Sequence, residues 1–116
     1  MKTVSDKMEA MAEKGKTAKL IKIANTSKNR EERCAAIWAL RLLREEEVIR
    51  CLLELIKEED AAIRKATANT LDRVATKLET DKLMHYADSE SDAEIAEILR
   101  GAAVNSKGRT PRWAKA

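Results

Sequence analysis

Two cysteines and a single histidine are the residues of this 116-residue chain best suited to nucleophilic catalysis or metal binding. A cysteine nucleophile needs a base beside it, and the only histidine, His85, falls in a different segment from Cys34 and Cys51. Both cysteines stand in apolar runs, where a reduced thiol behaves as a small buried hydrophobe. A disulfide between neighbouring helices is the alternative, which a reducing compartment disfavours. Because there is no C-x-x-C pair and no second histidine, we predict no metal site and no catalytic residue.

Clusters of acidic residues also have catalytic potential, because paired carboxylates can hydrolyse glycosidic bonds. The two clusters here, Glu45-Glu46-Glu47 and Glu58-Glu59-Asp60, stand at expected turns and helix starts, where acidic side chains are usually solvated or cap a helix. The chain lacks a glycine-rich phosphate loop, a G-x-S-x-G motif and an H-E-x-x-H motif. These observations predict a protein that is not an enzyme and holds no cofactor.

Trp38 is the residue that most favours a binding function, because tryptophan and arginine are the types most enriched at binding hot spots. Residues four apart share one face of a helix, so Trp38 belongs to a stripe of side chains, and a matching stripe lies on the next repeat, where Asn69 is the counterpart of Trp38. The two stripes consist of Arg30, Cys34 and Trp38, and of Lys65, Asn69 and Arg73. Side by side they would form a polar, mostly basic patch with one large aromatic ring. The alternative is that Trp38 packs beneath the first hairpin while the charged residues form a solvated face.

The last segment, residues 105–116, carries four cations and a tryptophan and is interrupted by Gly108 and Pro111. It cannot bury enough apolar surface to fold alone, so we expect a single domain over 1–104 and a basic, flexible C-terminal tail over 105–116. A cationic segment with an aromatic ring can clamp nucleic acid or an acidic protein, which makes Arg109, Arg112 and Trp113 candidate contacts. The alternatives are a solubilising or disordered terminus, or a tail whose tryptophan folds back over the last hairpin.

The composition favours helices and one modest core. Charged residues make up 37% of the chain and aromatic residues 3%, with three Gly and one Pro, whereas a sheet protein usually carries more aromatic residues and turn formers. No apolar run approaches the roughly 18 residues that span a bilayer, and no apolar run follows the N-terminus as in a signal peptide, so a cytoplasmic location is expected. Residues 1–30 are basic, with eight Lys/Arg against three Asp/Glu. Residues 31–100 are acidic, with 11 Lys/Arg against 17 Asp/Glu, and residues 101–116 are basic, with four Lys/Arg and no Asp/Glu. The two basic ends could meet an acidic partner.

Internal repeats organise the chain. Three short segments, 20–24, 52–56 and 83–87, share the pattern apolar, apolar, polar, apolar, apolar and begin 32 and 31 residues apart. The following segments also align, 32–43 with 63–74, and a degenerate third copy covers 93–104. Two helices in each repeat predict stacked helical hairpins, in which small residues at 35, 36, 66 and 68 allow close helix packing. The expected core residues are Leu40, Leu52, Ile56, Ile63, Leu71 and Val74.

Capping signals give the expected helix boundaries. Asn29 with Glu32 and Ser91 with Glu94 have the spacing of an N-cap residue and the third residue of its helix. Asp60 and Asp81 are expected to cap the helices that follow them, and Gly15 separates the first two helices. About seven helices are predicted, over 4–13, 16–26, 29–43, 46–58, 60–78, 81–88 and 91–104.

The aligned segments resemble the second helix of HEAT-like repeats, including those first named after phycocyanobilin lyases. That family favours a β-branched residue, Arg, two or three Ala, then Ala-Leu-Gly and a closing Ile or Val, as in Ile63-Arg64-Lys65-Ala66-Thr67-Ala68 and Leu71 to Val74. The resemblance covers about residues 16–104, but Arg41 and Asp72 replace the frequent Gly, and Glu32 stands where an apolar residue is usual. The resemblance implies an all-α fold, a short right-handed α-solenoid of antiparallel hairpins whose second helices line a concave binding face.

The most consistent function is that of a non-catalytic binding module, a protein–protein interaction adaptor or a small inhibitor of a larger assembly. The expected partner is another protein or complex with an acidic patch, with no membrane involved, and the chain is expected to be a monomer or weak dimer. Nucleic-acid binding through the basic ends and tail is the alternative, which the family permits but the acidic middle disfavours. The candidate contact residues are Arg30, Trp38, Lys65, Asn69, Arg73, Arg109, Arg112 and Trp113. A continuous positive groove would favour nucleic acid, whereas a mixed patch would favour protein.

Overall fold

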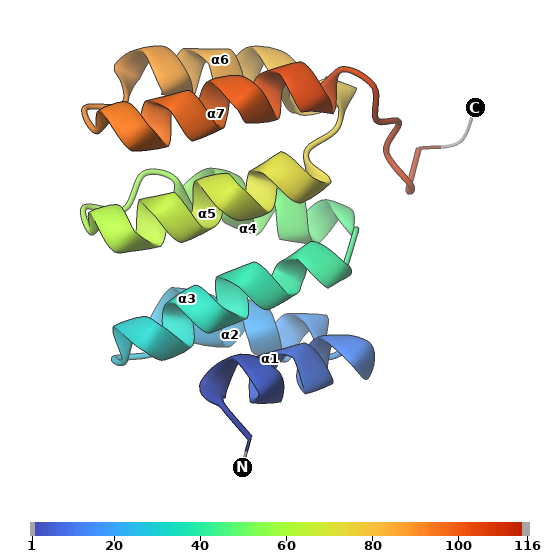
Figure 1. Ribbon diagram of the computed structural model, residues 1–116. Helices are drawn as coiled ribbons and strands as arrows, with labels where there is room; N and C mark the ends of the chain where they lie inside the picture. Colours follow the sequence, from blue (N-terminus) through green and yellow to red (C-terminus); the bar gives the residue numbers. More distant parts are fainter. Residues whose placement is uncertain (1, 115–116) are drawn as a thin grey trace.

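The fold is a stack of helical hairpins, seen in a computed structural model that describes residues 2–114 (Figure 1). Within those residues the chain forms helices and 3₁₀ turns and no strand, as predicted. The elements are α1 (Val4–Glu13), α2 (Thr17–Thr26), α3 (Arg30–Ala39), η1 (Leu40–Leu42), α4 (Glu46–Leu55), α5 (Ala61–Val74), η2 (Lys77–Glu79), α6 (Thr80–Ser89) and α7 (Ala93–Ser106). The predicted all-α solenoid is therefore confirmed.

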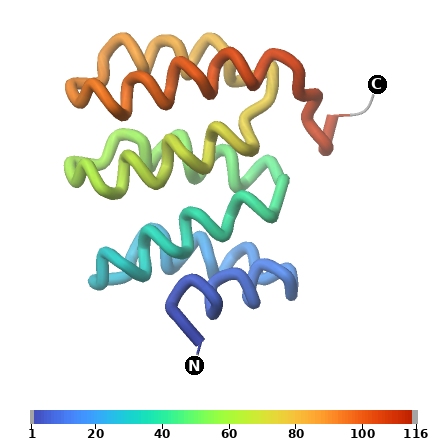
Figure 2. Tube along the Cα trace, in the orientation of Figure 1, coloured from blue at the N-terminus to red at the C-terminus, as the bar shows by residue number. Residues whose placement is uncertain are grey.

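The helices form two rows. The pairs α2–α3, α4–α5 and α6–α7 are antiparallel hairpins, and the chain trace shows them stacked one on another (Figure 2). The second helices α3, α5 and α7 form the front row in Figure 1, and the first helices α2, α4 and α6 lie behind them. Helix α1 extends the front row, because it packs mainly on α3 and runs alongside it. The front row therefore has one helix more than the back row.

The core lies between the two rows. All six predicted core residues are buried, and Leu40, Leu52, Ile63 and Leu71 are fully enclosed. Ala36 and Ala68 are also fully enclosed, whereas Ala35 and Ala66 are partly buried beside them. The Thr70 hydroxyl donates a hydrogen bond of 3.1 Å to the Ile37 carbonyl of the neighbouring second helix. Small side chains thus bring α3 and α5 close enough for a side chain of one to bond the backbone of the other.

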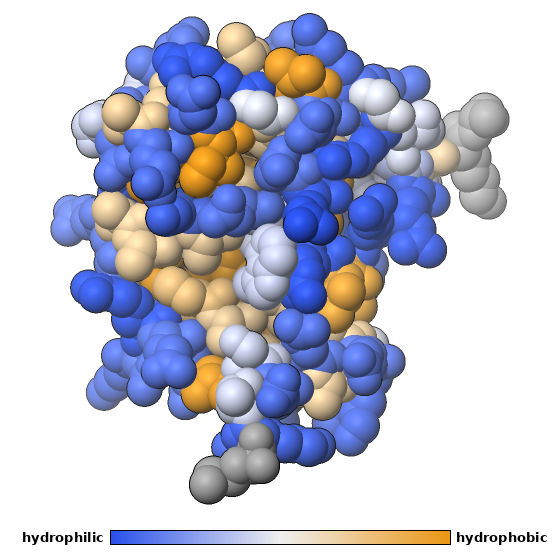
Figure 3. All heavy atoms as spheres, in the orientation of Figure 1, coloured by the Kyte–Doolittle hydropathy of each residue, from blue (hydrophilic) through white to orange (hydrophobic). Residues whose placement is uncertain are grey.

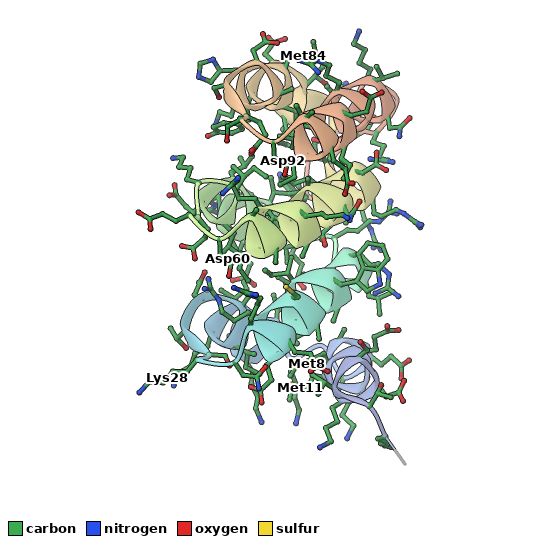
Figure 4. All side chains as sticks on the ribbon, turned by 60° about the vertical axis from the view of Figure 1, so that its left-hand side comes forward. Met8, Met11, Lys28, Asp60, Met84 and Asp92 are labelled. Atoms are coloured by element: carbon green, nitrogen blue, oxygen red, sulfur yellow. The ribbon has the colours of Figure 1, made fainter. Side chains whose placement is uncertain are left out.

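Two predicted helix caps are confirmed and two are wrong. The side chain of Asn29 accepts a bond of 3.0 Å from the Glu32 amide, and that of Asp60 accepts one of 2.9 Å from the Ala62 amide. Helix α7 is capped by Asp92, not Ser91, through a bond of 3.1 Å from the Ile95 amide; Asp60 and Asp92 lie at corresponding helix starts (Figure 4). Asp81 lies inside α6, because a 3₁₀ turn capped by Thr76 and Glu79 precedes that helix.

Gly15 makes the predicted break between α1 and α2. Its φ of 71° is a left-handed conformation that glycine adopts without strain. The break lets α2 turn away from α1, so that α2 begins the back row. Among residues 2–114, no helix is long and apolar enough to cross a membrane.

One arginine in each of the first two hairpins joins that hairpin to the next. The Arg33 guanidinium donates to the Ala24 carbonyl at 2.8 Å and to Glu58 at 2.9 Å. One repeat later, the Arg64 guanidinium donates to the carbonyls of Glu58 and Glu59 and holds Glu90 through two bonds of 3.0 and 3.1 Å. Each arginine thus bonds backbone carbonyls near the end of the first helix of its own hairpin, in α2 for Arg33 and in the following turn for Arg64, and a glutamate of the next hairpin.

The first prediction concerns the interior. Leu71→Ala should lower the free energy of unfolding by about 2–5 kcal/mol, because it removes a fully enclosed side chain and leaves a cavity between α5 and its neighbours. Leu78→Ala is the matched control, because Leu78 is 60% exposed, and it should change stability by less than about 0.5 kcal/mol. Urea unfolding followed by circular dichroism measures both. Equal stability of the two variants would contradict the position assigned to Leu71.

The second prediction concerns the arginine that joins the last two hairpins. The side chains of Arg64 and Glu90 are 15% and 6% exposed, so Arg64→Ala should cost about 3 kcal/mol by leaving a carboxylate buried without its partner. The pair Arg50–Glu46 is largely exposed, and Arg50→Ala should cost less than about 1 kcal/mol. The same unfolding experiment compares them. If both substitutions lower the free energy of unfolding by the same amount, burial of the Arg64–Glu90 pair adds nothing to stability.

Candidate functional site

The two predicted stripes lie side by side on the front row. At one end, Arg30 of α3 pairs with Asp60, which caps α5, at 2.7 Å. In the middle, the Cys34 thiol donates to the Ala62 carbonyl at 3.7 Å. At the other end, the guanidinium of Arg73 lies over the Trp38 ring. The repeat spacing thus correctly predicted that these two faces are neighbours.

Trp38 is half-buried and lies against two guanidinium groups. The Arg41 group is 4.4 Å from the ring centroid and the Arg73 group 5.5 Å from it, which are distances for cation–π attraction. Arg41 is itself fixed, because it donates to the Trp38 carbonyl at 3.0 Å and pairs with Glu9 of α1 at 3.3 Å. Helix α5 therefore contacts the ring directly through Arg73, whereas α1 acts on it only through the Glu9–Arg41 pair.

A groove of about 330 Å³ opens beside this ring, between α3 and α5. Its lining consists of Trp38, Ala66, Asn69, Asp72 and Arg73. The space-filling view of this side of the molecule shows a band of apolar residues across α3 and α5, with hydrophilic residues around it (Figure 3). The groove offers an aromatic wall, a small apolar floor and polar groups of both charges, so it is suited to an apolar side chain with polar neighbours.

The charges on this face are mixed rather than basic. Arg30 pairs with Asp60 and Lys65 with Glu94, so two of the expected cations already have acidic partners. Glu94 raises the pKa of Lys65 by accepting its hydrogen bond. For Asp60, burial acts to raise the pKa, but the hydrogen bonds from Arg30 and the Ala62 amide outweigh it and lower the pKa. Arg73 makes no ion pair within residues 2–114, which distinguishes it from the other two.

The tail residues lie elsewhere. Residues 105 and 106 belong to α7, so the helix extends two residues into the segment predicted as tail. Arg109 donates to the Ala75 carbonyl at 3.0 Å and accepts from the Lys77 amide at 2.9 Å, which ties it to the end of α5. Arg112 and the half-buried Trp113 line a separate groove with residues 42–46. Among the predicted contacts, the structure therefore groups Trp38, Asn69 and Arg73 in one groove and places the tail beside another; residues 115–116 lie outside the described part.

The predicted contacts did not include Arg41, which lies over the Trp38 ring, or Ala66 and Asp72, which line the groove. Arg41 stands three residues after Trp38 and so faces the same side of the chain. It also replaces a glycine that is frequent at this position in the repeats that the sequence resembles. That departure, at helical spacing from the only tryptophan in the helix, was the signal that could have identified it.

The cysteines and His85 do not form a reactive group. Cys51 is buried as predicted, and burial raises the pKa of its thiol to about 11. Cys34 is only half-buried, contrary to expectation, and burial together with the nearby Asp60 carboxylate raises the pKa of its thiol. His85 is exposed and lines a polar groove with Arg64, Tyr86 and Glu90, which contains neither cysteine. No three potential metal ligands gather in the part of the chain that the structure describes.

The acidic clusters have structural partners. The Glu45 carboxylate accepts a bond of 2.7 Å from the Thr17 hydroxyl, and Glu46 pairs with Arg50. Glu58 pairs with Arg33, and Asp60 caps α5. The cap made by Asp60 confirms the expectation that these residues begin helices, whereas the bonds of Glu45 and Glu58 to neighbouring hairpins were not predicted.

The comparison with protein families gives a match for three quarters of the chain. A family model described as HEAT repeats matches residues 17–104, which covers the three hairpins α2–α3, α4–α5 and α6–α7. Comparisons with curated proteins and with solved structures gave no match. HEAT repeats commonly mediate protein–protein interactions, and the family generally provides non-enzymatic scaffolds. The stacked hairpins, the repeat spacing and this match together establish that the chain belongs to the HEAT-repeat family.

Proposed function

We propose that the chain is a non-catalytic protein-binding module, an adaptor or small inhibitor of a larger assembly, that binds its partner in the groove around Trp38. The observation that carries this proposal is a half-exposed tryptophan held against two guanidinium groups at the edge of a groove. Large exposed aromatic rings are costly in water and are enriched where proteins bind each other.

The fixed position of the ring favours tight binding. Arg41 bonds the Trp38 carbonyl, pairs with Glu9 and covers the ring, so few rotamers remain open to the tryptophan. A side chain that is already ordered loses little conformational entropy when a partner covers it. The cation–π contact with Arg41 also strengthens when water is excluded, from about 0.5–1 kcal/mol at an exposed site to about 2 kcal/mol when desolvated.

Arg73 indicates the chemistry of the partner. Its guanidinium lies 5.5 Å from the ring centroid, and it makes no ion pair within residues 2–114. A guanidinium above an aromatic ring keeps its in-plane N–H groups available for a carboxylate. The best-fitting partner surface therefore places an apolar side chain over Trp38 and Ala66 and an acidic group at Arg73, which agrees with an acidic patch on the partner.

The mixed charges favour a protein partner over nucleic acid. A phosphate track needs cations that can release counterions, but Arg30 and Lys65 are already paired with acidic residues. Near the tail, Arg112 lines its groove together with Glu45 and Glu46, so acidic groups accompany its charge too. Salt titration separates the two classes, because a nucleic-acid complex weakens steeply and log-linearly with salt.

The third prediction follows from the non-catalytic proposal. With a thiol pKa of about 11, Cys51 should react with iodoacetamide at pH 8 roughly two orders of magnitude more slowly than an unfolded cysteine, because far less thiolate is present. Rates in native and in guanidinium-unfolded protein, resolved by mass spectrometry, measure this difference. Alanine variants of Cys34, Cys51 and His85 that fold normally should keep full binding. Fast native labelling of Cys51, or a folded variant without binding, would contradict the proposal.

The fourth prediction tests the groove. Trp38→Ala should weaken binding of the partner by over about 2 kcal/mol, because it removes the ring from the contact surface. Arg73→Glu should also weaken binding through repulsion of the acidic group, and this exposed residue can change without loss of the fold. Lys65→Ala should cost about 1 kcal/mol or less, because Lys65 is a rim charge already paired within the chain.

The partner is first isolated by affinity capture from native cell extract, with and without nuclease, and binding is then measured with the purified component by calorimetry. Arg50→Ala is the control, because Arg50 is an exposed arginine of α4 in the back row. Wild-type affinity of the Trp38→Ala/Arg73→Glu double variant would show that the groove is not the binding site. Loss of the captured component after nuclease treatment would reassign the function to nucleic-acid binding.

A further inference from the structure

One position of the repeat carries three very different residues on the three second helices. Trp38 of α3 corresponds to Asn69 of α5, which lies 31 residues later, and Asn69 corresponds to Gly101 of α7, which lies 32 residues after it. The residues that cap these helices keep the same two spacings. Since α3, α5 and α7 pack side by side in the front row, the three residues form a row that crosses the helices (Figure 1).

Gly101 leaves a notch in this row. It lies inside α7, it is exposed, and a Cβ atom placed on it would meet no atom within 4 Å. Its φ is not positive, so no left-handed conformation requires glycine here. Glycine inside a helix lowers stability relative to alanine, because the unfolded chain loses more freedom on folding. Packing and backbone geometry within residues 2–114 thus give no reason for glycine, whereas close approach of another chain to the helix backbone does.

Four side chains of α7 frame the notch, since residues three and four positions away are neighbours on a helix. Asn105 lies toward α5, to which it donates a hydrogen bond, and Ile98 shares that side because it stands seven residues earlier. Glu97 and Val104 lie on the other side, where Val104 is 64% exposed. The notch is therefore bare backbone with an aliphatic side chain on each flank, which suits a large apolar side chain of a partner.

Asn69 lies between Trp38 and the notch and offers hydrogen bonds. Its side chain is exposed and lines the Trp38 groove, and no group within residues 2–114 bonds its amide. A primary amide has donors and an acceptor, which match the N–H and C=O groups of an extended chain. A helix satisfies most of its own backbone groups, so it has few to offer this amide. Asn69 therefore favours an extended segment over a helix.

The unpaired charges differ between the two ends of the row. Arg73, beside Trp38, makes no ion pair within residues 2–114, and Glu97, beside Gly101, makes none there either. The other charged groups between α5 and α7, which are Lys65, Glu94 and Asp72, are bonded within the chain. An acidic residue of a partner therefore fits at the Trp38 end, and a basic residue fits at the Gly101 end.

We propose that an extended segment of the partner crosses α3, α5 and α7 along this row, with one apolar residue in the Trp38 groove and a second, large one in the notch at Gly101. The inference rests on the proposed function and adds a second contact site and the conformation of the bound segment. Packed helices are about 8–10 Å apart, so two spacings, about 16–20 Å, separate the two contact sites. At about 3.3 Å per residue, the two apolar residues are about five or six positions apart.

Peptides displayed on phage supply the probes. A random library of peptides of about 12 residues, which span up to about 40 Å when extended, is selected on the immobilised full chain. Enriched peptides are synthesised with a fluorescein label, and their binding is measured by fluorescence anisotropy. Those that lose about tenfold or more in affinity for folded Trp38→Ala are the groove probes. Their sequences should share two large apolar residues at the expected spacing, with an acidic residue beside one of them.

Gly101→Gln separates recognition from stability. Glutamine fills the notch and is a better helix former than glycine, so this variant should unfold at a higher urea concentration than the wild type. It should nevertheless bind the groove probes about tenfold or more weakly, because its side chain occupies the place of the second apolar residue. Ala93→Gln is the matched control, because it adds the same side chain at an exposed position in the first turn of α7, and it should bind as the wild type does.

A scan of the probe backbone tests the contact with Asn69. N-methylation of one peptide nitrogen at a time, between the two apolar residues, removes one N–H donor from the probe. At one position it should weaken binding to the wild type severalfold and cause no further loss in Asn69→Ala, because the same hydrogen bond is already absent there. An effect of equal size in the wild type and in Asn69→Ala would show that Asn69 does not bond the peptide backbone.

The outcomes separate this inference from the proposed function. Full affinity of the groove probes for Gly101→Gln, or an equal loss in Ala93→Gln, would overturn the notch as a contact site while Trp38 remains the binding residue. Absence of any enriched peptide that depends on Trp38 would overturn the extended segment, and the captured partner would still test the groove itself. Retained binding of that partner by the Trp38→Ala/Arg73→Glu variant would overturn both.

Discussion

The stack depends on one interaction, in which an arginine of a second helix bonds backbone carbonyls near the end of its hairpin's first helix and a glutamate of the next hairpin. A hairpin of two short helices cannot enclose its apolar side, so each must rest on its neighbour in one register. Van der Waals packing of alanine and leucine permits sliding, whereas the two bonds from Arg64 to Glu90 fix both the distance and the direction of approach. Arg33 repeats this arrangement toward Glu58. At the corresponding place in α7, four residues after the cap, stands Ala96, so the series of arginines ends with the last hairpin.

The register set in this way also creates the candidate groove beside Trp38. With α3 and α5 held side by side, Arg73 reaches the ring of Trp38 from the next repeat, and Ala66 becomes the floor between them. A shift of one helical turn, about 5.4 Å, would place Arg73 beyond the ring and leave only Arg41 over the tryptophan. Helix α1 contributes in the same manner, because Glu9 holds Arg41 only while α1 stays packed on α3. The geometry of the groove is therefore a consequence of how the hairpins stack.

Much of the fold was predictable because the sequence repeats and each repeat forms one helical hairpin. The spacing of Leu40 and Leu71 and the small residues between them indicated which sides of the helices meet, and all six expected core residues are buried. The errors occur where the repeat is degenerate: the third copy begins at Asp92 rather than Ser91, and a 3₁₀ turn displaces the expected cap at Asp81. In the site, sequence spacing correctly placed Trp38 beside Arg73. Sequence spacing could not predict the ion pair of Lys65 with Glu94, because it depends on side-chain rotamers. It could not predict the hydrogen bond from Arg109 to the Ala75 carbonyl either, because that bond depends on the path of the chain after α7.

The candidate groove coincides with positions at which the repeat is broken. Trp38 corresponds to Asn69 and Arg41 to Asp72, and Trp38, Asn69 and Asp72 line the groove between α3 and α5. Positions that build the stack carry the same or similar residues in the first two hairpins, such as Leu40 and Leu71 in the core and Arg33 and Arg64 in the bonds between hairpins. A residue at the edge of such a contact is not held to that pattern, and a change there costs little stability. Trp38 is such a position, and its ring is held by Arg41 and Arg73 while one side of it faces the groove. Under the proposed function, this exposed side of the ring is what the partner contacts.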